Sequence, residues 1–584
     1  MRLGWTTSKY STTYRAVKTT RIDGKNVTVT VKSFGSEKFI KETYGVEDAK
    51  KWAQEQVNLM NQEEAEDDDV LIRLSPKKDR PMHEQKRYNA GYLYLQQIYY
   101  ELGLDRICKA ISKKHAFEFN LNSILSRLIY TRILYPSSKL GSLEDSKRFI
   151  EPPDFELQHI YRSLSVLAEE SDYIQTKLFK SSLKLVKRKT GIIYYDCTNF
   201  YFEINAAEDD KQYGYSKEHR PNPIVQMGLF MDAEGIPLAF SINPGNQNEQ
   251  LSLKPLEQKL IDNFGMSKFV VCTDAGLSSY DNRKFNDYDD EAGNNRAFVT
   301  TQSIKTLKKD LKTWALAPEG WSLKGSKELF NINEIDEEKH KESIFYKKRM
   351  IRIQKEPKSK ETLDQQLIIT YSIEYRDYAR KVREGQKARA EKLIEQGIKK
   401  IETKGQNDPR RFIKGTHTTK DGTQAQKVKY EINQSVIDEE AKYDGFYGIG
   451  TNLSDNVETI LEITKRRWEI EECFRIMKSE FAARPVYVRR QDRIVAHFIT
   501  CFIALIIYRF LEKRLDEKFT CSKIIDELKE LDYLKREGWG YEPIFERTEL
   551  TNALDSVFGS ETSKEFLSLK KVRNFCAKTK KGVV

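Results

Sequence analysis

The first hydrophobic pattern in the chain is a strict alternation near the N-terminus. Residues 13–17 and 27–31 alternate between polar and apolar side chains, and Asp23-Gly24 between them is a type I′ turn signal. We therefore predict a β-hairpin over residues 1–40, and its lysines and arginines make it basic.

The next two segments differ in the periodicity of their apolar residues. Residues 41–84 contain an acidic run at residues 63–69, which is typical of an exposed and mobile connection, so we predict a linker there. Residues 85–188 repeat apolar residues at helical spacing and are predicted to form a helical region. The cations expected on the polar faces of these helices are Arg127, Arg132, Lys139, Lys147 and Arg148.

From residue 189 the hydrophobic pattern becomes that of strands. Three apolar runs with polar loops between them are followed by a helical segment, a strand, a helix-length connection and another strand. This order predicts a mixed α/β sheet over residues 189–305, completed by residues 446–512. We interpret residues 306–445 as an insertion with strand-like runs and a long cation-rich helix, and residues 513–584 as a mostly helical, basic tail.

Composition narrows the class of protein. A chain of 584 residues exceeds one hydrophobic core, so we expect three or four lobes. Its 32% charged and 11% aromatic residues are typical of a globular, soluble protein, and its net charge of +11 favours a polyanionic partner. The basic hairpin and the helical region are each either a DNA-binding element or an ordinary solvated scaffold, and composition does not separate these alternatives.

The cysteine and hydropathy patterns argue against other classes. The seven cysteines include no CxxC pair, so neither a zinc knuckle nor a disulfide framework is indicated, and we expect buried thiols in a reducing cytoplasm. The most apolar run, residues 494–511, contains Arg509, and the part before Arg509 is shorter than the ~20 residues that a membrane span needs. We predict a buried helix there and no membrane partner.

Two of the apolar strands end in an aspartate. Asp196 follows Ile-Ile-Tyr-Tyr, and Asp274 follows Phe-Val-Val-Cys-Thr. A single aspartate at a strand end is usually a turn former or a helix cap, which is how we interpret Asp232 and Asp262. Asp196 and Asp274 therefore become candidates for a functional site only in combination with a third carboxylate.

That third carboxylate lies in a segment without Pro or Gly that runs from Arg467 to Lys478 and predicts a helix. At about 100° per residue, Arg467, Glu471 and Lys478 fall within roughly 40° of one another, beside an apolar stripe. The two cations either contact phosphate or bridge to Glu471 within the helix. Glu469 and Glu472 point away from this row, and we expect them to be solvated or in surface pairs.

We interpret Asp196, Asp274 and Glu471 as one metal site. Carboxylate oxygens are the hard ligands that Mg²⁺ or Mn²⁺ prefers. Two such ions about 3.5–4 Å apart can activate a water or a 3′-hydroxyl and stabilise the leaving oxygen of a phosphodiester. Three carboxylates close together repel one another, so we expect the ions to order the site.

The combination of motifs resembles the DDE transposases of bacterial insertion sequences, in the group with a Tyr-Arg-Glu-Lys signature. That signature is Tyr-x2-Arg-x3-Glu-x6-Lys, and Arg467, Glu471 and Lys478 match it, whereas Thr464 stands in the tyrosine position. The resemblance covers residues from about 120 to 512. The other matching stretches are Tyr-Tyr-Asp196-Cys-Thr, Gly214-Tyr-Ser-Lys-Glu-His-Arg-Pro221, Pro-Gly-Asn246-Gln-Asn-Glu249, Thr-Asp274-Ala-Gly, and Arg484-Pro-Val-Tyr-Val-Arg-Arg490 followed by His497.

The resemblance implies a fold and a site. The fold is a ribonuclease-H-like catalytic domain with a β-rich insertion between the second aspartate and the glutamate, and with a helical N-terminal region that binds the terminal inverted repeats of the element. Arg467 and Lys478 would bind phosphate near the cleaved DNA end. The catalytic residues, which would hold two Mg²⁺ or Mn²⁺ ions, are Asp196, Asp274 and Glu471.

The resemblance also suggests an aromatic contact with DNA. Some relatives stack a tryptophan of the insertion on a flipped base, so Trp314 and Trp321 are candidates. Tryptophan more often belongs to the hydrophobic core, and the sequence leaves that alternative open for both residues.

From these residues and the resemblance we expect a transposase that cleaves terminal inverted repeats and joins the freed 3′-hydroxyl ends to target DNA. The expected partner is double-stranded DNA, bound by a homodimer, in the bacterial cytoplasm at the nucleoid. One alternative is a ribonuclease-H-like nuclease that cuts without joining. Another is a domesticated DNA-binding protein without catalysis, against which the intact set of two aspartates and a glutamate argues.

Overall fold

The chain forms two compact units, Met1–Glu84 and Gln85–Val584. In this computed structural model the described residues are 1–581, except 9–10, 23–24, 67–76, 78, 80–81, 398–406 and 418–427. The predicted Asp23-Gly24 turn, the end of the acidic run and much of the lysine- and glycine-rich end of the insertion lie outside the described residues.

The first unit is a small antiparallel sheet with two helices. Its elements are β1 (Arg2–Thr7), β2 (Thr12–Ile22), β3 (Lys25–Ser36), α1 (Glu37–Tyr44) and α2 (Ala49–Glu66). The strands lie in the order β1-β2-β3, and Trp52 of α2 packs between Phe34 and Tyr44. Residues 41–66, expected to be part of a linker, are therefore largely helical, because their apolar side chains complete the core of this unit.

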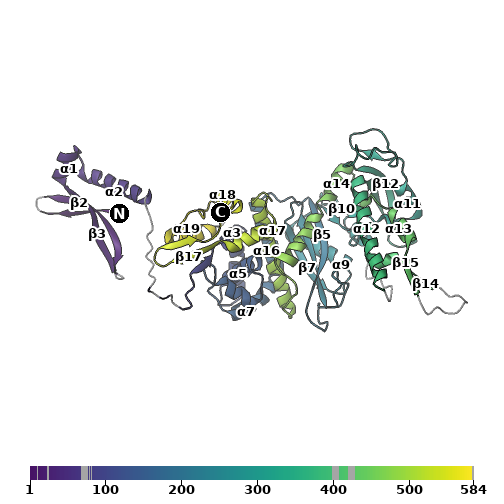
Figure 1. The fold of residues 1–584 in the computed structure, drawn as a ribbon, viewed down its shortest axis with the longest axis horizontal. Helices are drawn as coiled ribbons and strands as arrows, with labels where there is room; N and C mark the ends of the chain where they lie inside the picture. Colours follow the sequence, from purple (N-terminus) through teal and green to yellow (C-terminus); the bar gives the residue numbers. More distant parts are fainter. Residues whose placement is uncertain are drawn as a thin grey trace. The chain divides into compact units, whose positions relative to one another are not determined.

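A mixed sheet is the centre of the second unit (Figure 1). Its strands are β5 (Ile192–Tyr201), β6 (Ile224–Asp232), β7 (Pro237–Pro244), β8 (Lys268–Thr273), β9 (Tyr288–Asp289), β10 (Asn295–Thr301), β11 (Ser322–Leu323), β12 (Phe345–Gln354), β13 (Thr362–Tyr371) and β16 (Phe446–Thr451). They lie in the order β11-β12-β13-β16-β10-β8-β5-β6-β7, with β9 paired to β10. The meander β5-β6-β7, followed by the parallel strands β8 and β10 on the other side of β5, is the strand order of a ribonuclease-H-like fold.

Helices cover both faces of this sheet (Figure 1). The elements around it are α9 (Gln250–Phe264), α10 (Tyr280–Phe285), α14 (Val457–Lys465), α15 (Trp468–Arg475), a π-helical turn η3 (Ile476–Glu480) and α16 (Gln491–Arg514). Alternation along β5 separates the two faces. Tyr194 and Phe200 pack into the core that contains α16, whereas Ile193 and Tyr195 pack into the core that contains α9.

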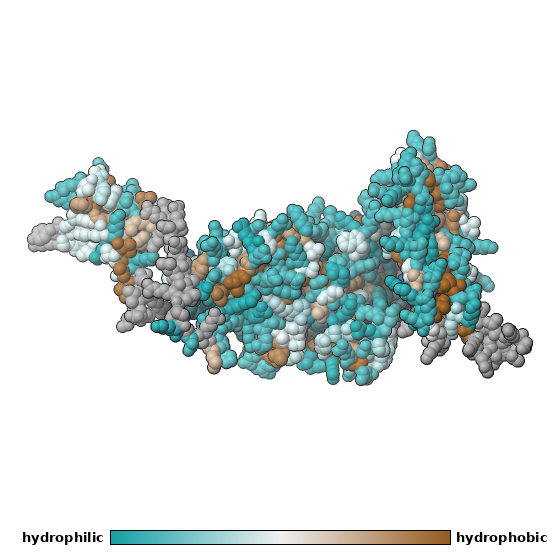
Figure 2. Space-filling view, in the orientation of Figure 1, coloured by the Kyte–Doolittle hydropathy of each residue, from teal (hydrophilic) through white to brown (hydrophobic). Residues whose placement is uncertain are grey.

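The helix α16 has the length and hydropathy of a membrane span, but it is buried. In its most apolar stretch of 18 residues, 94% is buried inside the protein, which confirms the prediction of a buried helix. Figure 2 shows hydrophilic side chains over most of the visible face of the second unit. The seven cysteines are free and buried, as expected.

The insertion extends the central sheet. β12 pairs with β13, and β13 pairs with β16, so the ladder runs without a break from the α/β domain into the insertion. The periodicity of the sequence indicated strands and a long helix here, but not that the strands would join the central sheet. The remaining elements are η1 (Ile304–Thr306), α11 (Lys309–Leu316), α12 (Ile373–Glu395), η2 (Pro409–Phe412), β14 (Ile413–His417), β15 (Val428–Ile432) and α13 (Gln434–Ala441).

The helical region and the C-terminal segment share one core. The helical region contains β4 (Arg87–Asn89), α3 (Tyr92–Glu101), α4 (Leu104–Lys114), α5 (Leu121–Leu134), α6 (Lys139–Ser146), α7 (Leu157–Glu169) and α8 (Ser171–Leu185). The C-terminal segment contains α17 (Cys521–Glu530), β17 (Asp532–Arg536), β18 (Gly540–Pro543), α18 (Glu549–Phe558), β19 (Leu567–Ser568) and α19 (Leu569–Thr579). β4 pairs with β17, so the tail that was expected to be mostly helical also supplies strands that close the helical region.

Three cations expected on polar helix faces are buried instead. Arg127, Arg132 and Lys139 are 8%, 5% and 6% exposed. Arg127 and Arg132 lie on α5, which is buried on all sides by the surrounding helices, including α16, so its inferred polar face is internal. Lys139 begins α6, which packs against α5. Lys147 is exposed and Arg148 is half-buried.

Candidate active site

The strand register brings Asp196 and Asp274 together. β5 and β8 are parallel, and Tyr194 of β5 lies opposite Cys272 of β8. Asp196 and Asp274 each follow two residues later, so their side chains point to the same face from neighbouring strands. The charge of Asp274 influences the pKa of Asp196, as expected for adjacent carboxylates.

The end of β10 adds a hydroxyl to this row. Thr300 of β10 lies opposite Thr273 of β8, which puts Thr301 beside Asp274. Arg467 Nη1 donates a hydrogen bond to Thr301 Oγ1 at 2.6 Å, and Thr301 Oγ1 lies 2.6 Å from the hydroxyl of Tyr447. The ends of β8 and β10 and the middle of β5 therefore form a polar edge, and Arg467 binds one end of it. The sequence placed Asp196 at a strand end, but β5 continues past it to Tyr201.

The segment from Arg467 to Lys478, which we call the signature helix, crosses this edge from β10 to β5. Arg467 precedes α15, and the π-helical turn η3 carries Lys478, whose Nζ donates to Thr198 Oγ1 at 2.6 Å. Glu471 lies one turn after Arg467, between the two anchored cations. The segment is thus an α-helix that ends in a π turn, and not the uninterrupted α-helix that the sequence predicted. Such turns are frequent at functional sites.

Glu471 is solvent-exposed, and the oxygens of Asp196, Asp274 and Glu471 do not converge on one point. Within the described ranges, three potential ligand atoms approach within 4.8 Å of one another only at His115, Glu169 and Glu170. Lys114 and His115 both bind Glu170, so that cluster already has its counter-charge. The strand register brings the two aspartates together, and Glu471 lies on the helix whose flanking cations, Arg467 and Lys478, bind β10 and β5.

Two further charged residues reach the site from polar loops. Lys217 donates to the carbonyl of Cys197, next to Asp196, and its Nζ lies 3.7 Å from Glu249 Oε1. The sequence alone assigned no role to Lys217 or Glu249. The available signal was that both belong to stretches quoted for the family resemblance.

Several groups at the site have shifted pKa values. Burial and the charge of Asp274 raise the pKa of Asp196 to about 6, and the same two causes raise the pKa of Glu249. Burial and the charge of Lys217 lower the pKa of Lys478 to about 8. Carboxylates that resist ionisation and a lysine that resists protonation are typical of sites that bind charged ligands.

The two glutamates beside Glu471 have structural partners. Glu472 forms a surface pair with Arg475 at 2.5 Å, as expected. Glu469 was expected to be solvated or in a surface pair, but it is 8% exposed and pairs with the buried Arg509 at 3.2 Å. The correction arises because this face of α15 packs against α16.

The tryptophans of the insertion belong to its core. Trp321 is fully buried, and its Nε1 donates to the carbonyl of Ala317 at 3.0 Å. This placement leaves no ring face for a DNA base, which corrects the expected DNA contact at Trp321. Trp314 is partly buried and packs against the same core.

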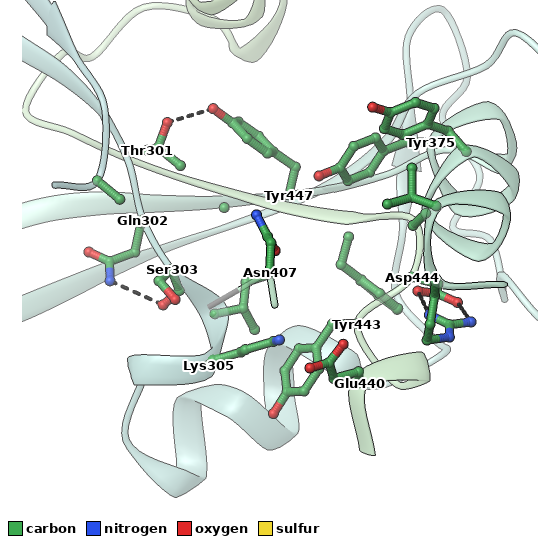
Figure 3. Close-up of a pocket in the computed structure, with 18 of the residues that line it drawn as sticks. Thr301, Gln302, Ser303, Lys305, Tyr375, Asn407, Glu440, Tyr443, Asp444 and Tyr447 are labelled. Atoms are coloured by element: carbon green, nitrogen blue, oxygen red, sulfur yellow. Dashed lines mark hydrogen bonds and ion pairs between the residues drawn. The ribbon is translucent and has the colours of Figure 1, made fainter. Parts of the chain in front are cut away.

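A cavity of about 540 Å³ adjoins the polar edge (Figure 3). Thr301 and the residue after Asp274 line one side of it, where Thr301 bonds to Tyr447. Tyr375 and Tyr378 of α12 line the other side and are 43% and 63% exposed. Their rings are parallel to within 21° at a centroid distance of 6.4 Å.

The fold and site define a ribonuclease-H-like α/β protein with an acidic edge at its parallel strands. The family model described as transposase DDE domain matches residues 187–507, more than half of the 584-residue chain. The chain therefore belongs to the transposase DDE domain family.

Comparison with solved structures gives matches of low similarity. A piggyBac transposase synaptic complex with hairpin DNA is 8% identical, covers 86% of this chain and 89% of its own, and has a TM-score of 0.35. A Mos1 transposase paired-end complex with left transposon end is 12% identical, covers 42% of this chain and 68% of its own, and has a TM-score of 0.12. Comparison with curated protein sequences finds no match.

Proposed function

We propose that the protein is a cut-and-paste DNA transposase that cleaves the terminal inverted repeats of its element and joins the 3′-hydroxyl ends to target DNA. The observation that carries this proposal is the register that puts Asp196 beside Asp274, with Glu471 on the helix that crosses them. Membership in the transposase DDE domain family supports the reaction class.

The residues of the site fit a divalent cation. Asp196 and Asp274 offer hard oxygen ligands from neighbouring strands, and their mutual repulsion is relieved when a cation binds between them. Two Mg²⁺ or Mn²⁺ ions held by these aspartates and Glu471 would supply activation of a water or a 3′-hydroxyl and neutralisation of the leaving oxygen.

The cations of the site hold the DNA backbone in this proposal. Arg467 presents a planar guanidinium to a phosphate, and Lys217 and Lys478 add two ammonium groups. Glu249 positions Lys217 through the contact at 3.7 Å. The contacts of Arg467 with Thr301 and of Lys478 with Thr198 hold both side chains before DNA arrives, which lowers the entropic cost of binding.

We assign the aromatic DNA contact to Tyr375 and Tyr378 rather than to the tryptophans. These tyrosines are exposed, parallel and beside the polar edge, and base stacking requires an accessible ring face. The helical region would bind the inverted repeats, with two copies of the chain in the DNA complex at the bacterial nucleoid.

The test is cleavage of a duplex that carries the element's inverted repeat, in Mg²⁺ or Mn²⁺. We expect Asp274→Asn and Glu471→Gln to abolish cleavage and strand transfer. The matched control is Glu472→Gln, which changes the neighbouring glutamate of α15 and is expected to keep activity within about twofold, because surface changes are nearly neutral.

The products separate the alternatives. Joined products support a transposase, whereas cleavage without joining would indicate a nuclease of the same fold. DNA binding without any cleavage would indicate a protein that has lost catalysis. Cleavage that survives in Glu471→Gln would reject the assignment of the third carboxylate.

A further inference from the structure

A second cavity, of about 330 Å³, lies between the helical region and the loop that follows the signature helix. Ser138 and Tyr487 at its rim are exposed. Arg132, Lys139 and His497 also line it, and they are 5%, 6% and 6% exposed. The cavity is therefore open to solvent at its rim, and its lining contains two buried cations.

The ammonium group of Lys139 has no hydrogen-bond partner. Among the buried lysines and arginines in the described part of the chain, it is the one whose charged group is wholly unpartnered. Arg132 donates through its two Nη atoms to the carbonyls of Phe481 and Ser137, at 3.1 and 3.2 Å, and its Nε is buried without a partner. Both cations therefore keep hydrogen-bonding capacity that the protein does not use.

Two other buried cations of the described residues bind a carboxylate, whereas Arg127, Arg283 and Lys347 donate to hydroxyl, amide or carbonyl oxygens. Arg188 binds Asp232, and Arg509 binds Glu469. Lys139 has no such neighbour within the described residues, and burial together with the charge of Arg132 lowers its pKa to about 7. Because an uncompensated buried charge is costly, this arrangement points to a counter-charge that comes from outside the chain.

We propose that this cavity binds a phosphate group. The ammonium of Lys139 and the free Nε of Arg132 supply two charged donors, and the hydroxyl of Tyr161, which also lines the cavity, supplies a neutral one. The hydroxyl of Ser137 already donates to Asp145 Oδ2 at 3.3 Å. The oxygens of a phosphate are strong acceptors for ammonium, guanidinium and hydroxyl donors of this kind.

The backbone of bound DNA is the source of phosphate that the contacts favour. Arg484 lines the cavity and pairs with Glu218, and Glu218 Oε1 lies 3.8 Å from Lys478 Nζ. The cavity is thus linked by charged contacts to a residue assigned above to the phosphate at the cleaved end. The choice of DNA rests on the proposed function, whereas phosphate binding by itself does not.

The first experiment measures thermal unfolding of the full chain without metal, in inorganic phosphate and in chloride at equal ionic strength. We expect phosphate to raise the Tm of the wild type and of Lys147→Met, which changes an exposed lysine next to α6. Lys139→Met should lose this shift, and in chloride it should melt at or above the wild-type temperature because an unpaired buried charge is gone. Lys139→Arg, which keeps the charge, should keep a phosphate shift.

The second experiment measures duplex binding by fluorescence anisotropy, without metal, over a range of salt concentrations. Loss of one charge-assisted contact in Lys139→Met should weaken binding about 10-fold and lower the slope of log K against log[salt] by about 1. Lys139→Arg should keep the wild-type slope.

The outcomes separate the two parts of the inference. A phosphate shift that survives in Lys139→Met, or that the wild type lacks, would overturn the site. If phosphate raised the Tm as expected but Lys139→Met left the salt dependence of DNA binding unchanged, DNA would be rejected as the source of the phosphate. The ligand would then be a free phosphate compound. Neither the thermal melt nor the anisotropy titration requires DNA cleavage. A wild-type protein that does not cleave DNA would therefore count against the proposed function without affecting either measurement.

Discussion

Asp232 and Asp196 are both aspartates of the central sheet, and their surroundings are opposite. Asp232 is fully buried at the end of β6, where it binds Arg188 and accepts hydrogen bonds from the amides of Glu234 and Ile236 at 3.0 and 2.9 Å. Asp196 is half-buried and accepts from the amide of Cys197 at 2.7 Å. One carboxylate is saturated by the fold, and the other keeps oxygen lone pairs for a ligand.

The difference explains why position in a strand does not identify a catalytic aspartate. Asp232 stabilises a tight turn that ends at Gly235, whose φ of +75° and close contacts with the Arg509–Glu469 pair exclude a side chain. Asp196 faces another carboxylate, Asp274, from the next strand. Two adjacent carboxylates repel each other unless a cation lies between them, which supports the proposal that the second arrangement binds metal.

The largest effect that separates the two aspartates is on catalysis. Asp196→Asn removes a ligand of the proposed ions and is expected to lower the cleavage rate by at least about 10³-fold, or roughly 4 kcal/mol. Its Tm should stay level or rise, because a carboxylate that burial destabilises is gone. Single-turnover cleavage and a thermal melt of the same sample test both statements. A drop in Tm that accounts for the lost activity would contradict them.

The converse variant, Asp232→Asn, should affect stability. It leaves the guanidinium of Arg188, whose side chain is 1% exposed, without a counter-charge, and breaking such a buried pair costs about 3–5 kcal/mol. Hydrogen exchange of the β6 and β7 amides should show the loss. Asp262→Asn, an exposed change on α9, is the control, with an expected effect below about 0.5 kcal/mol. If the β6 amides of Asp232→Asn exchanged as slowly as in the wild type, the Asp232–Arg188 pair would have no structural role.

Glu257 of α9 sharpens the comparison, since it is a buried carboxylate without a bound cation. It is 0% exposed, accepts from Asn286 Nδ2 at 2.9 Å, and burial raises its pKa to about 8. The folded state then keeps a proton that the unfolded state releases above its ordinary pKa of 4.5. Stability should therefore fall as pH rises from about 5 to 8, by up to about 3 kcal/mol.

Glu257→Gln should remove that pH dependence. The amide cannot titrate but keeps the acceptor for Asn286, so melting temperatures of the variant should change little between pH 5 and 8 while those of the wild type fall. Equal slopes for the two proteins would show that Glu257 ionises freely in the folded state.

The sequence was sufficient to predict much of the sheet and insufficient to predict its register. The apolar runs before Asp196 and Asp274 identified two strands, because each run has a strand's length and ends at a polar residue. That β5 and β8 are parallel neighbours depends on contacts between segments more than 70 residues apart, which periodicity does not encode. The same limit hid the continuation of the sheet through β13.

Side-chain environments were predicted less well than elements. Trp321 and Lys139 were each assigned from residue type, the first as a possible stacking ring and the second as a surface cation. The structure buries both, because packing of neighbouring elements decides exposure. Lys217 and Glu249 were missed for the complementary reason, since polar loops have no periodicity that indicates where their side chains point.

The smallest effect, and the sharpest test of the difference between saturated and open carboxylates, is stabilisation by metal. Mn²⁺ or Mg²⁺ at 100 times its Kd should stabilise the wild type by about 2.7 kcal/mol if it binds the folded state alone. Asp274→Asn should lose this stabilisation. Asp232→Asn should keep it, although this variant starts from a lower Tm, because the carboxylate of Asp232 binds Arg188 and not a metal. Calorimetry with and without EDTA measures both. If Asp274→Asn were stabilised as strongly as the wild type, the open carboxylates would not be the metal ligands, and the distinction drawn from their surroundings would fail.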